Sequence, residues 1–461
     1  MKRIVHLDLK GAPLKLSYFE KVLLLAKSWG ATGVLLEWED TFPYSGELEG
    51  IGSRTNAGGD GLYSDEDVKH ILQLAKDMGL EAIQLVQTIG HMEYVLKHPV
   101  YQGLREAARS PAVLCPSRPE SQALVRNMLD QVLGAQPDAA YLHIGADEVW
   151  HTAVCNECQQ RALMSRHKAA SLYLEHIRDL ALFLKLKRPE LNVLMWDDML
   201  RPISVDTLIE YGLGGLVQPV VWHYNPSESF NIDPNLWRKY QQVFPCAWAG
   251  SAFKGANGSC QILSPVEHYV SNHEAWMREF KNNEGVNFAG IILTGWSRFD
   301  HYASLCELLP VSLPSLASCL RTLSNSDETP KVCVASSEAA HAQCGGSRLA
   351  HALQAFLLAR GRGRALLNSD VVTTWLNPWQ IEHKYTNPLH LEGIVFGVQS
   401  LLSELTTLQR DISTHLHAIT GQRSSEEWIQ SYVTPIVQEL TNLHQTAESM
   451  ARCDAGVKPL R

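Results

Sequence analysis

The stretch Tyr141-Leu142-His143-Ile144-Gly145 is a short apolar run that leads almost directly into two adjacent carboxylates, Asp147 and Glu148. Similar apolar runs precede and follow it, and longer stretches with helical periodicity separate them. The other runs cover residues 4–9, 34–39, 82–88, 193–197, 216–222, 243–248 and 290–296. Strands that alternate with helices indicate parallel βα units. Eight such units within roughly 300 residues predict an α/β fold of the (β/α)8 TIM barrel type.

An open, doubly wound parallel sheet is the alternative fold. It usually carries a Gly-x-Gly-x-x-Gly turn after its first strand, and none follows residues 4–9. Polar and aromatic residues also stand just after several of the runs. Only a closed barrel gathers the carboxyl ends of all its strands around one pocket, so this placement favours the barrel.

The alternation of strands and helices stops near residue 325. Residues 326–330 have the composition of a linker, and apolar residues then recur every three to four positions from Ile394 to Leu416. A turn at Gly421 precedes a second helical stretch. We therefore predict a catalytic barrel over residues 1–325 and a C-terminal helical region over residues 326–461. An antiparallel helical hairpin is expected at about 387–453, packed on the barrel or on a second subunit of a homodimer. A peptide-binding groove is the alternative.

The composition excludes several classes of protein. Forty Lys and Arg residues against 49 Asp and Glu residues give a net charge of −9, which disfavours nucleic acid as a partner. The 45% of hydrophobic residues suits a globular protein with a large core. We find no signal peptide and no apolar run of about 18 residues that would span a membrane. The ten scattered cysteines predict a reduced, intracellular protein, so we expect a cytoplasmic location, with the nucleus as a second compartment.

Adjacent carboxylates after a buried strand are the strongest candidate for a catalytic site. The structural alternative is that Asp147 caps a following helix and Glu148 is an acid of its first turn. The aromatic residues favour catalysis, because four tryptophans are expected near the carboxyl ends of strands: Trp196, Trp222, Trp248 and Trp296. Such rings can stack on the apolar faces of a sugar. Carboxylates within aromatic walls are what the cleavage of a glycosidic bond requires.

The segment Gly145-Ala146-Asp147-Glu148 resembles the Gly-x-Asp-Glu motif of glycoside hydrolase family 20. Residues 87–91 and 196–199 are supporting matches, and the resemblance runs through the barrel from His6 to Arg298. It implies a β-N-acetylhexosaminidase acting on glycoconjugates or oligosaccharides with a terminal, non-reducing β-linked N-acetylgalactosamine or N-acetylglucosamine. The implied mechanism is substrate-assisted retention, in which the acetamido group of the sugar is the nucleophile. No metal and no organic cofactor are implied.

The resemblance also implies roles for individual residues. Glu148 would protonate the leaving oxygen and then deprotonate water. Asp147 would hold the acetamide and offset the positive charge that develops. His91 would support the acid. The tryptophans at positions 196, 222 and 296 would line the acetamido pocket and the sugar platform.

The chain departs from the family pattern at the positions that bind the sugar hydroxyls. Asp8 and Lys10 stand near the position of an arginine that binds the 3- and 4-hydroxyls in many relatives. Tyr224 would replace a tyrosine that strand seven often supplies, and Arg298 and Asp300 follow the last strand where a glutamate is common. The preference for gluco or galacto sugars therefore stays open, although the resemblance favours galactosaminides.

Cys155 and Cys158 form a lone Cys-x-x-Cys pair. Structural zinc needs four ligands, so the pair alone indicates a structural role, with redox modulation as the alternative. A cation held by Asp197, Asp198 and His91 is disfavoured, because no His-x-His motif follows the first strand. We therefore predict no metal site.

Two other functions stay open at this point. One is an ordinary two-carboxylate retaining glycosidase with Glu37 or Glu39 as the nucleophile. The other is a sugar-binding protein without catalytic activity.

Overall fold

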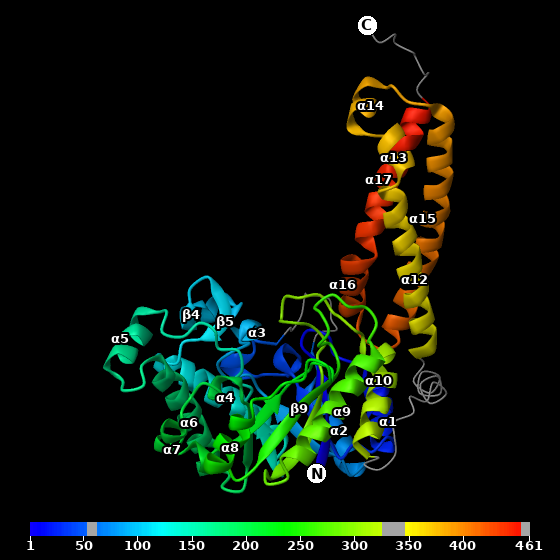
Figure 1. The fold of residues 1–461 in the computed structure, drawn as a ribbon. Helices are drawn as coiled ribbons and strands as arrows, with labels where there is room; N and C mark the ends of the chain where they lie inside the picture. The colour runs from blue at the N-terminus through cyan, green and yellow to red at the C-terminus, as the bar shows by residue number, and fades with distance from the viewer. Residues whose placement is uncertain (53–61, 325–345, 453–461) are drawn as a thin grey trace. The chain divides into compact units, whose positions relative to one another are not determined.

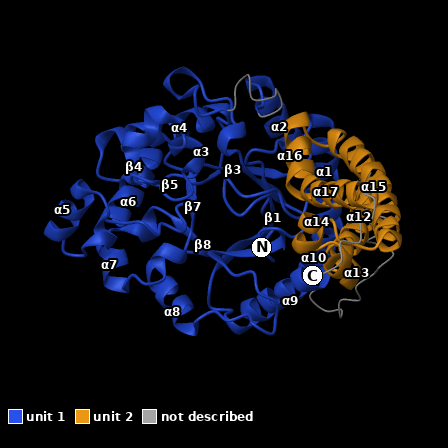
Figure 2. Ribbon diagram, turned by 90° about the horizontal axis from the view of Figure 1, so that it is seen from above, with its two compact units in different colours: residues 1–344 blue, residues 345–461 orange. Residues whose placement is uncertain are grey.

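The computed structural model of the chain describes residues 1–52, 62–324 and 346–452. The chain divides into two compact units, residues 1–344 and 345–461 (Figures 1 and 2). The predicted linker at residues 326–330 lies outside the described residues. The predicted boundary after residue 325 and the division after residue 344 fall at the two ends of that same segment, so the exact boundary stays a prediction.

Unit 1 contains a closed barrel of parallel strands, which confirms the predicted (β/α)8 fold. The strands follow each other around the barrel in chain order, and the last pairs with the first. Their bounds are β1 Lys2–Asp8, β2 Gly33–Glu37, β3 Glu81–Leu85, β6 Tyr141–His143, β7 Asn192–Trp196, β8 Gln218–Trp222, β9 Ala247–Lys254 and β10 Phe288–Gly295. Figure 2 shows the helices of this unit arranged around the strands.

The helices of unit 1 cover the outside of the barrel. Their bounds are α1 Leu16–Ser28, α2 Asp65–Asp77, α4 Pro119–Ala135, α6 Ala169–Lys187, α7 Val205–Glu210, α8 Pro234–Val243, α9 Val266–Asn282 and α10 Leu309–Ser324. Because helices shield one face of the strands and the barrel interior the other, strands such as β2 are buried along their whole length. Burial on both faces explains why such strands appear in the sequence as continuous apolar runs.

Four short elements extend the loops that follow β3 and β6. The antiparallel strands β4 (Arg105–Ala107) and β5 (Ser110–Leu114) lie between β3 and α4, after the short helix α3 (Glu93–Leu96). Helix α5 (Asn156–Met164) lies between β6 and α6. Both extensions begin at carboxyl ends of barrel strands, the face on which barrel enzymes carry their sites.

Strand β9 lies further along the chain than predicted. The apolar residues from 243 to 246, which suggested a strand, end helix α8 and form its connection to β9. The strand itself is rich in small residues, because large neighbours occupy the space beside it: a Cβ atom on Gly250 would lie 2.9 Å from Cβ of Trp222. Small residues weaken the apolar signal, and so the prediction was shifted.

The shift changes the place of Trp248. This residue is the second of β9, not its last, and it is fully buried in the barrel core. Its Nε1 donates to Oε1 of Gln218, 2.8 Å away, and its ring packs edge-on against Tyr141. Gln218 and Tyr141 are the first residues of their own strands. The prediction that Trp248 faces a substrate is therefore wrong, since it lies at the amino end of the barrel.

Unit 2 is a helical bundle with one more long helix than predicted. The long helices α12 (Gly346–Leu367), α15 (Pro388–His417) and α17 (Thr434–Ala451) pack pairwise, and α13 (Asp370–Trp375), α14 (Pro378–His383) and α16 (Gln422–Tyr432) are shorter. The predicted hairpin corresponds to α15 with α16 and α17. Gly361 and Gly363 in α12 hid the third helix, because glycine disfavours helix, yet Gly363 packs closely against Leu440. Within the described residues, no helix is both long and apolar enough to cross a membrane.

We expect Trp248→Ala to lower the free energy of unfolding by about 3–5 kcal/mol, because it empties a fully buried indole site. Urea unfolding followed by circular dichroism measures this change. The control is Trp150→Ala, whose side chain is 73% exposed and should change stability by no more than about 0.5 kcal/mol. Equal unfolding midpoints for the two variants would show that Trp248 is not a core residue.

Candidate active site

A cavity of about 360 Å³ opens at the carboxyl end of the barrel strands. Its volume lies within the usual range of about 300–1,000 Å³ for small-molecule sites. It is lined by residues that follow β1, β3, β6, β8, β9 and β10: Lys10, Gln87, His91, Asp147, Glu148, Trp222, Tyr224, Gly255, Ala256, Gly258, Ser259, Trp296, Arg298 and Phe299. The two adjacent carboxylates thus share one pocket with aromatic and cationic side chains.

The backbone after β6 turns sharply so that Asp147 and Glu148 both reach the pocket. Gly145, Ala146 and Glu148 have φ angles of +62°, +71° and +50°. Residues other than glycine rarely adopt this conformation, which costs on the order of 1–3 kcal/mol each. Asp147 does not cap a helix, since α5 begins only at residue 156 and Cys155 is its N-cap. The capping interpretation of the pair is therefore wrong.

Gln87 holds the turn from the end of the neighbouring strand β3. Its Oε1 accepts from the backbone N–H of Ala146, and its Nε2 donates to Oδ1 of Asp147, each over 3.3 Å. Two glycines make room for this approach. A Cβ atom on Gly145 would lie 2.0 Å from Oε1 of Gln87, and one on Gly90 would lie 2.0 Å from the carbonyl oxygen of Asp147. Both segments can therefore meet only with glycine at these positions.

Asp198 and Tyr173 hold the other side of the turn. The hydroxyl of Tyr173 donates to the carbonyl oxygen of Ala146 (2.8 Å), and Oδ2 of Asp198 accepts from the backbone N–H of Glu148 (2.9 Å). The other oxygen of Asp198 accepts from Nε1 of Trp222 (3.3 Å). Burial and the nearby charge of Asp147 raise the pKa of Asp198 to about 7. From the sequence, Asp198 was considered only as a disfavoured cation ligand, although it stands in one of the matched segments.

His91 bridges the two carboxylates. Its Nε2 lies 3.4 Å from Oδ2 of Asp147 and 3.3 Å from Oε2 of Glu148. Burial alone would lower the pKa of His91, but the carboxylates, Asp147 above all, raise it well above its usual value. The raised pKa favours the protonated form of the ring, which places a positive charge between the two side chains.

The predicted aromatic residues take three different places. Trp222, Tyr224 and Trp296 line the pocket, and the rings of Trp222 and Tyr224 stack with centroids 5.3 Å apart. Trp196, the last residue of β7, lies one layer behind, 1% exposed and 5.9 Å from Trp296 between ring centroids. It supports the wall and does not line it. Trp248 is remote, as described above.

Of the polar residues that were predicted to contact the substrate, some line the pocket and others do not. Arg298 lines the pocket, but Asp8 and Asp300 do not. Asp8 is buried beneath it, where its Oδ2 accepts from the backbone N–H of Ser297 over 2.7 Å. Asp300 accepts backbone N–H groups of its own turn at Oδ1. Lys10 is the residue after β1 that reaches the pocket.

Lys10 is surrounded by buried carboxylates below the pocket. Its Nζ lies 3.8 Å from Oε1 of Glu37 and 3.7 Å from Oε1 of Glu39, and 5.1 Å from the ring centre of Trp296. Burial opposes ionisation of Glu37, yet Lys10 and a hydrogen bond with His6 lower its pKa to about 2. Neither Glu37 nor Glu39 lines the pocket. This placement disfavours both as nucleophiles.

Sequence analysis missed part of the pocket wall. The segment after β9 contributes Gly255, Ala256, Gly258 and Ser259, and the misplaced strand concealed it. Phe299 stands at the rim, 68% exposed, and its sequence position carries no signal of its own. Gln87 was visible only as part of a matching segment.

Two groups of side chains bear on metal binding. Asp197, one of the carboxylates considered, pairs with Arg201 over 2.6 Å. Away from the pocket, however, Glu106 and Cys115 lie beside Cys155 and Cys158, and their ligand atoms are within 4.8 Å of one another. Glu106 and Cys115, which no local spacing in the sequence connects to the Cys-x-x-Cys pair, bring the number of candidate ligand atoms to four.

Comparison with known proteins gives a consistent result. The model of the glycosyl hydrolase family 20 catalytic domain matches residues 38–213. The chain is 39% identical to hexosaminidase D of Homo sapiens over 460 residues, which covers 96% of this chain and 93% of that protein. It is 43% identical to hexosaminidase D of Bos taurus over 326 residues, or 70% of this chain and 92% of that protein.

Among solved structures, Flavobacterium johnsoniae chitobiase matches with a TM-score of 0.56 at 13% identity, covering 97% of this chain and 71% of that one. This likeness concerns the fold alone. The human relative aligns with nearly the whole sequence, and the pocket contains the acid pair within the matched region. The chain belongs to glycoside hydrolase family 20.

Proposed function

We propose that this family 20 β-hexosaminidase releases terminal β-linked N-acetylhexosamine with Glu148 as acid and base and Asp147 as the partner of the acetamide. The observation that carries the proposal is the convergence of both carboxylates on His91 Nε2 in one pocket walled by Trp222 and Trp296. A carboxylate pair within aromatic walls suits a sugar whose charge develops only in the transition state.

The proposed reaction has two steps. In the first, the acetamido oxygen of the substrate attacks the anomeric carbon while Glu148 gives its proton to the departing glycosidic oxygen. Asp147 accepts a hydrogen bond from the acetamide N–H and offsets the positive charge of the oxazolinium ion. In the second, water attacks the anomeric carbon, the ring of the oxazolinium opens, and Glu148 recovers a proton from the water.

The geometry supports a nucleophile that belongs to the substrate. In a two-carboxylate retaining enzyme the acid and the nucleophile lie on opposite faces of the sugar, about 5–5.5 Å apart. Asp147 and Glu148 are consecutive and meet the same nitrogen of His91, so they approach from one side. Glu37 and Glu39 are buried and paired below the pocket.

The side chains that would hydrogen-bond to the hydroxyls of the sugar are cationic. Lys10 and Arg298 line the pocket and can donate hydrogen bonds to a sugar, whereas Tyr224 adds a buried hydroxyl. We infer that Lys10 takes the part of the arginine found after the first strand in many relatives. A screen of aryl N-acetyl-β-galactosaminide against aryl N-acetyl-β-glucosaminide tests substrate preference, and inactivity on both would favour a sugar-binding protein without catalysis.

A reduced compartment is part of the proposal. Every cysteine of the described residues is a free thiol, including the closely spaced Cys115, Cys155 and Cys158. We propose action on glycoconjugates in the cytoplasm and nucleus, by a monomer or homodimer. Cell fractionation and light scattering test the location and the oligomeric state.

We expect Glu148→Gln to lower kcat on a natural disaccharide by roughly 10²–10⁴-fold, because the amide cannot protonate the leaving oxygen. An aryl substrate with a good leaving group should lose less in its first step. Steady-state assays on both substrates measure this difference. Glu120→Gln, an exposed carboxylate on α4, is the control and should keep full activity. Unchanged disaccharide hydrolysis by Glu148→Gln would remove Glu148 from the mechanism.

A substrate nucleophile predicts that a thiazoline mimic of the oxazolinium binds at least about 10²-fold more tightly than the parent sugar. A 2-deoxy-2-fluoro glycoside, which traps protein nucleophiles, should leave no adduct after incubation. Inhibition constants and intact-protein mass spectrometry are the measurements. A glycosyl adduct on Glu37 or Glu39 would establish the two-carboxylate mechanism instead.

We expect His91→Gln to destabilise the protein in a pH-dependent way. Because the folded-state pKa of His91 lies well above 6.5, its stabilising contribution is full below that pH and fades as the pH rises through the raised value. Urea unfolding at a series of pH values measures the difference from wild type, with the exposed His70→Gln as control. A difference that does not shrink at alkaline pH would contradict the charged bridge.

A further inference from the structure

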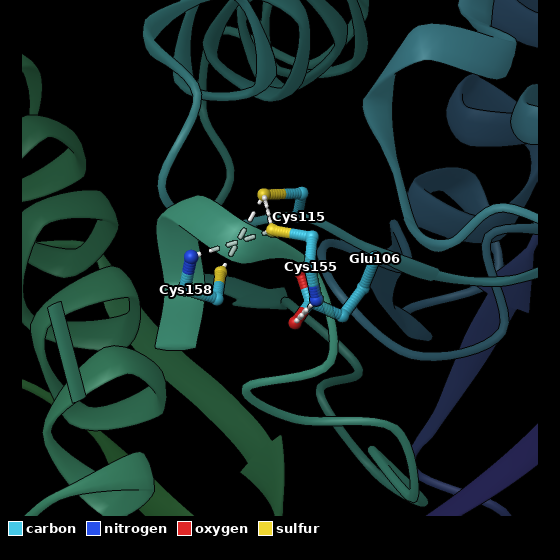
Figure 3. Close-up of side chains that lie close together, drawn as sticks. All are labelled: Glu106, Cys115, Cys155 and Cys158. Carbon is cyan, nitrogen blue, oxygen red and sulfur yellow. Dashed lines mark hydrogen bonds between the residues drawn. The ribbon is translucent and has the colours of Figure 1, made fainter. Parts of the chain in front are cut away.

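A second cluster of reactive side chains lies outside the pocket. Glu106 comes from β4, Cys115 directly follows β5, Cys155 is the N-cap of α5 and Cys158 lies in its first turn (Figure 3). The close-up shows the side chains of all four turned toward one another. Nothing in the proposed reaction uses them.

The spacing of the sulfur atoms matches a tetrahedral metal site. Sγ of Cys115 lies 3.5 Å from Sγ of Cys155 and 3.5 Å from Sγ of Cys158. Tetrahedral zinc with Zn–S bonds of about 2.3 Å holds its sulfurs roughly 3.8 Å apart. One carboxylate oxygen of Glu106 completes a set whose atoms all lie within 4.8 Å of one another. The two sulfur–sulfur distances differ from the tetrahedral value by only a few tenths of an ångström.

The carboxylate of Glu106 points to a missing positive charge. The residue is 2% exposed, and its Oε1 accepts from the backbone N–H groups of Val154 (2.6 Å) and Cys155 (3.2 Å). Its Oε2 is buried and accepts no hydrogen bond from an N–H or O–H group of the described residues. Its side-chain neighbours there are the thiols of Cys155 and Cys158. A buried carboxylate is costly unless a cation balances it.

Neighbouring groups orient the sulfur atoms. The backbone N–H of Cys158 donates to Sγ of Cys155 (3.4 Å), and Oγ of Ser117 lies 2.8 Å from Sγ of Cys158. Arg161 in turn donates to Oγ of Ser117 over 3.0 Å. Such outer contacts fix the ligands of metal sites and tune their charge.

We propose that Glu106, Cys115, Cys155 and Cys158 bind one zinc ion in a closed, structural site. Thiolates select zinc over magnesium and calcium, and four protein ligands leave no open position for catalysis. Binding would release the thiol protons to solvent. A disulfide explains the cluster less well, because Cys115 lies equally far from two thiols and an S–S bond would use only one.

The proposed ion would join two loops that start at different barrel strands. The hairpin β4–β5 follows β3, and the segment ending at Cys155 follows Glu148 of the active site. The metal would thus fix the far end of the segment that carries the catalytic acid.

The first experiment measures metal content in the full chain, purified without a histidine tag. Inductively coupled plasma mass spectrometry should find about one zinc per chain. Cys115→Ser and Cys158→Ser should lose it, whereas Cys246→Ser, at a free cysteine just before β9, should keep it. Wild type that lacks zinc and takes none up, that holds another metal instead, or whose variants at positions 115 and 158 keep their zinc would overturn the proposal.

A second measurement remains decisive if the serine variants fail to fold. Wild type stripped of metal and reloaded with Co²⁺ should show thiolate-to-cobalt charge-transfer absorption. Glu106→Gln, which keeps the shape of the side chain, should retain that absorption but bind zinc roughly 10-fold or more weakly. Absence of thiolate bands in the cobalt-loaded protein, or unchanged zinc affinity of Glu106→Gln, would contradict the assignment.

Discussion

Asp147 and Glu148 are consecutive residues whose carboxylates must face the same pocket, and this requirement shapes the structure around them. Only a backbone with left-handed residues on both sides of Asp147 achieves it. Such a turn persists only where its surroundings determine it. The closed barrel supplies those surroundings, because Gln87 after β3, Asp198 after β7 and Tyr173 on α6 all hydrogen-bond to residues 146–148.

The titratable side chains of the site form two layers. In the pocket, the ring of His91 lies between the acid pair. Below the pocket, Lys10 and His6 contact the carboxylates of Asp8, Glu37 and Glu39. Buried carboxylates are tolerated only when such partners are present. Because Lys10 belongs to the lower layer and also lines the pocket, a change at this residue would disturb both substrate contacts and the charges beneath them.

The repeated βα units and the local motif around Asp147 could be predicted from the sequence. Eight apolar runs gave the barrel, and the motif around Asp147 gave the pocket, because parallel strands bring their carboxyl ends together. Predictions failed at residues whose position depends on a contact that the local sequence does not reveal. Gly250 is small because Trp222 occupies its space, so β9 and the depth of Trp248 were misjudged. Asp8 and Asp300 are polar residues near strand ends, yet backbone N–H groups engage them away from the pocket.

The cluster of Glu106, Cys115, Cys155 and Cys158 could not be predicted from the sequence for the same reason. It also affects the strained turn that precedes Cys155 in the chain. Cys115 and Cys155 are 40 positions apart in sequence, so no local spacing rule could join them. A turn with unfavourable φ angles relaxes when the chain on one side of it is free to move. The segment after Glu148 is fixed at Cys155 by Glu106, whose Oε1 accepts both backbone N–H groups there. A zinc ion at the cluster would strengthen that restraint, so the metal would preserve the orientation of Glu148 without lining the pocket.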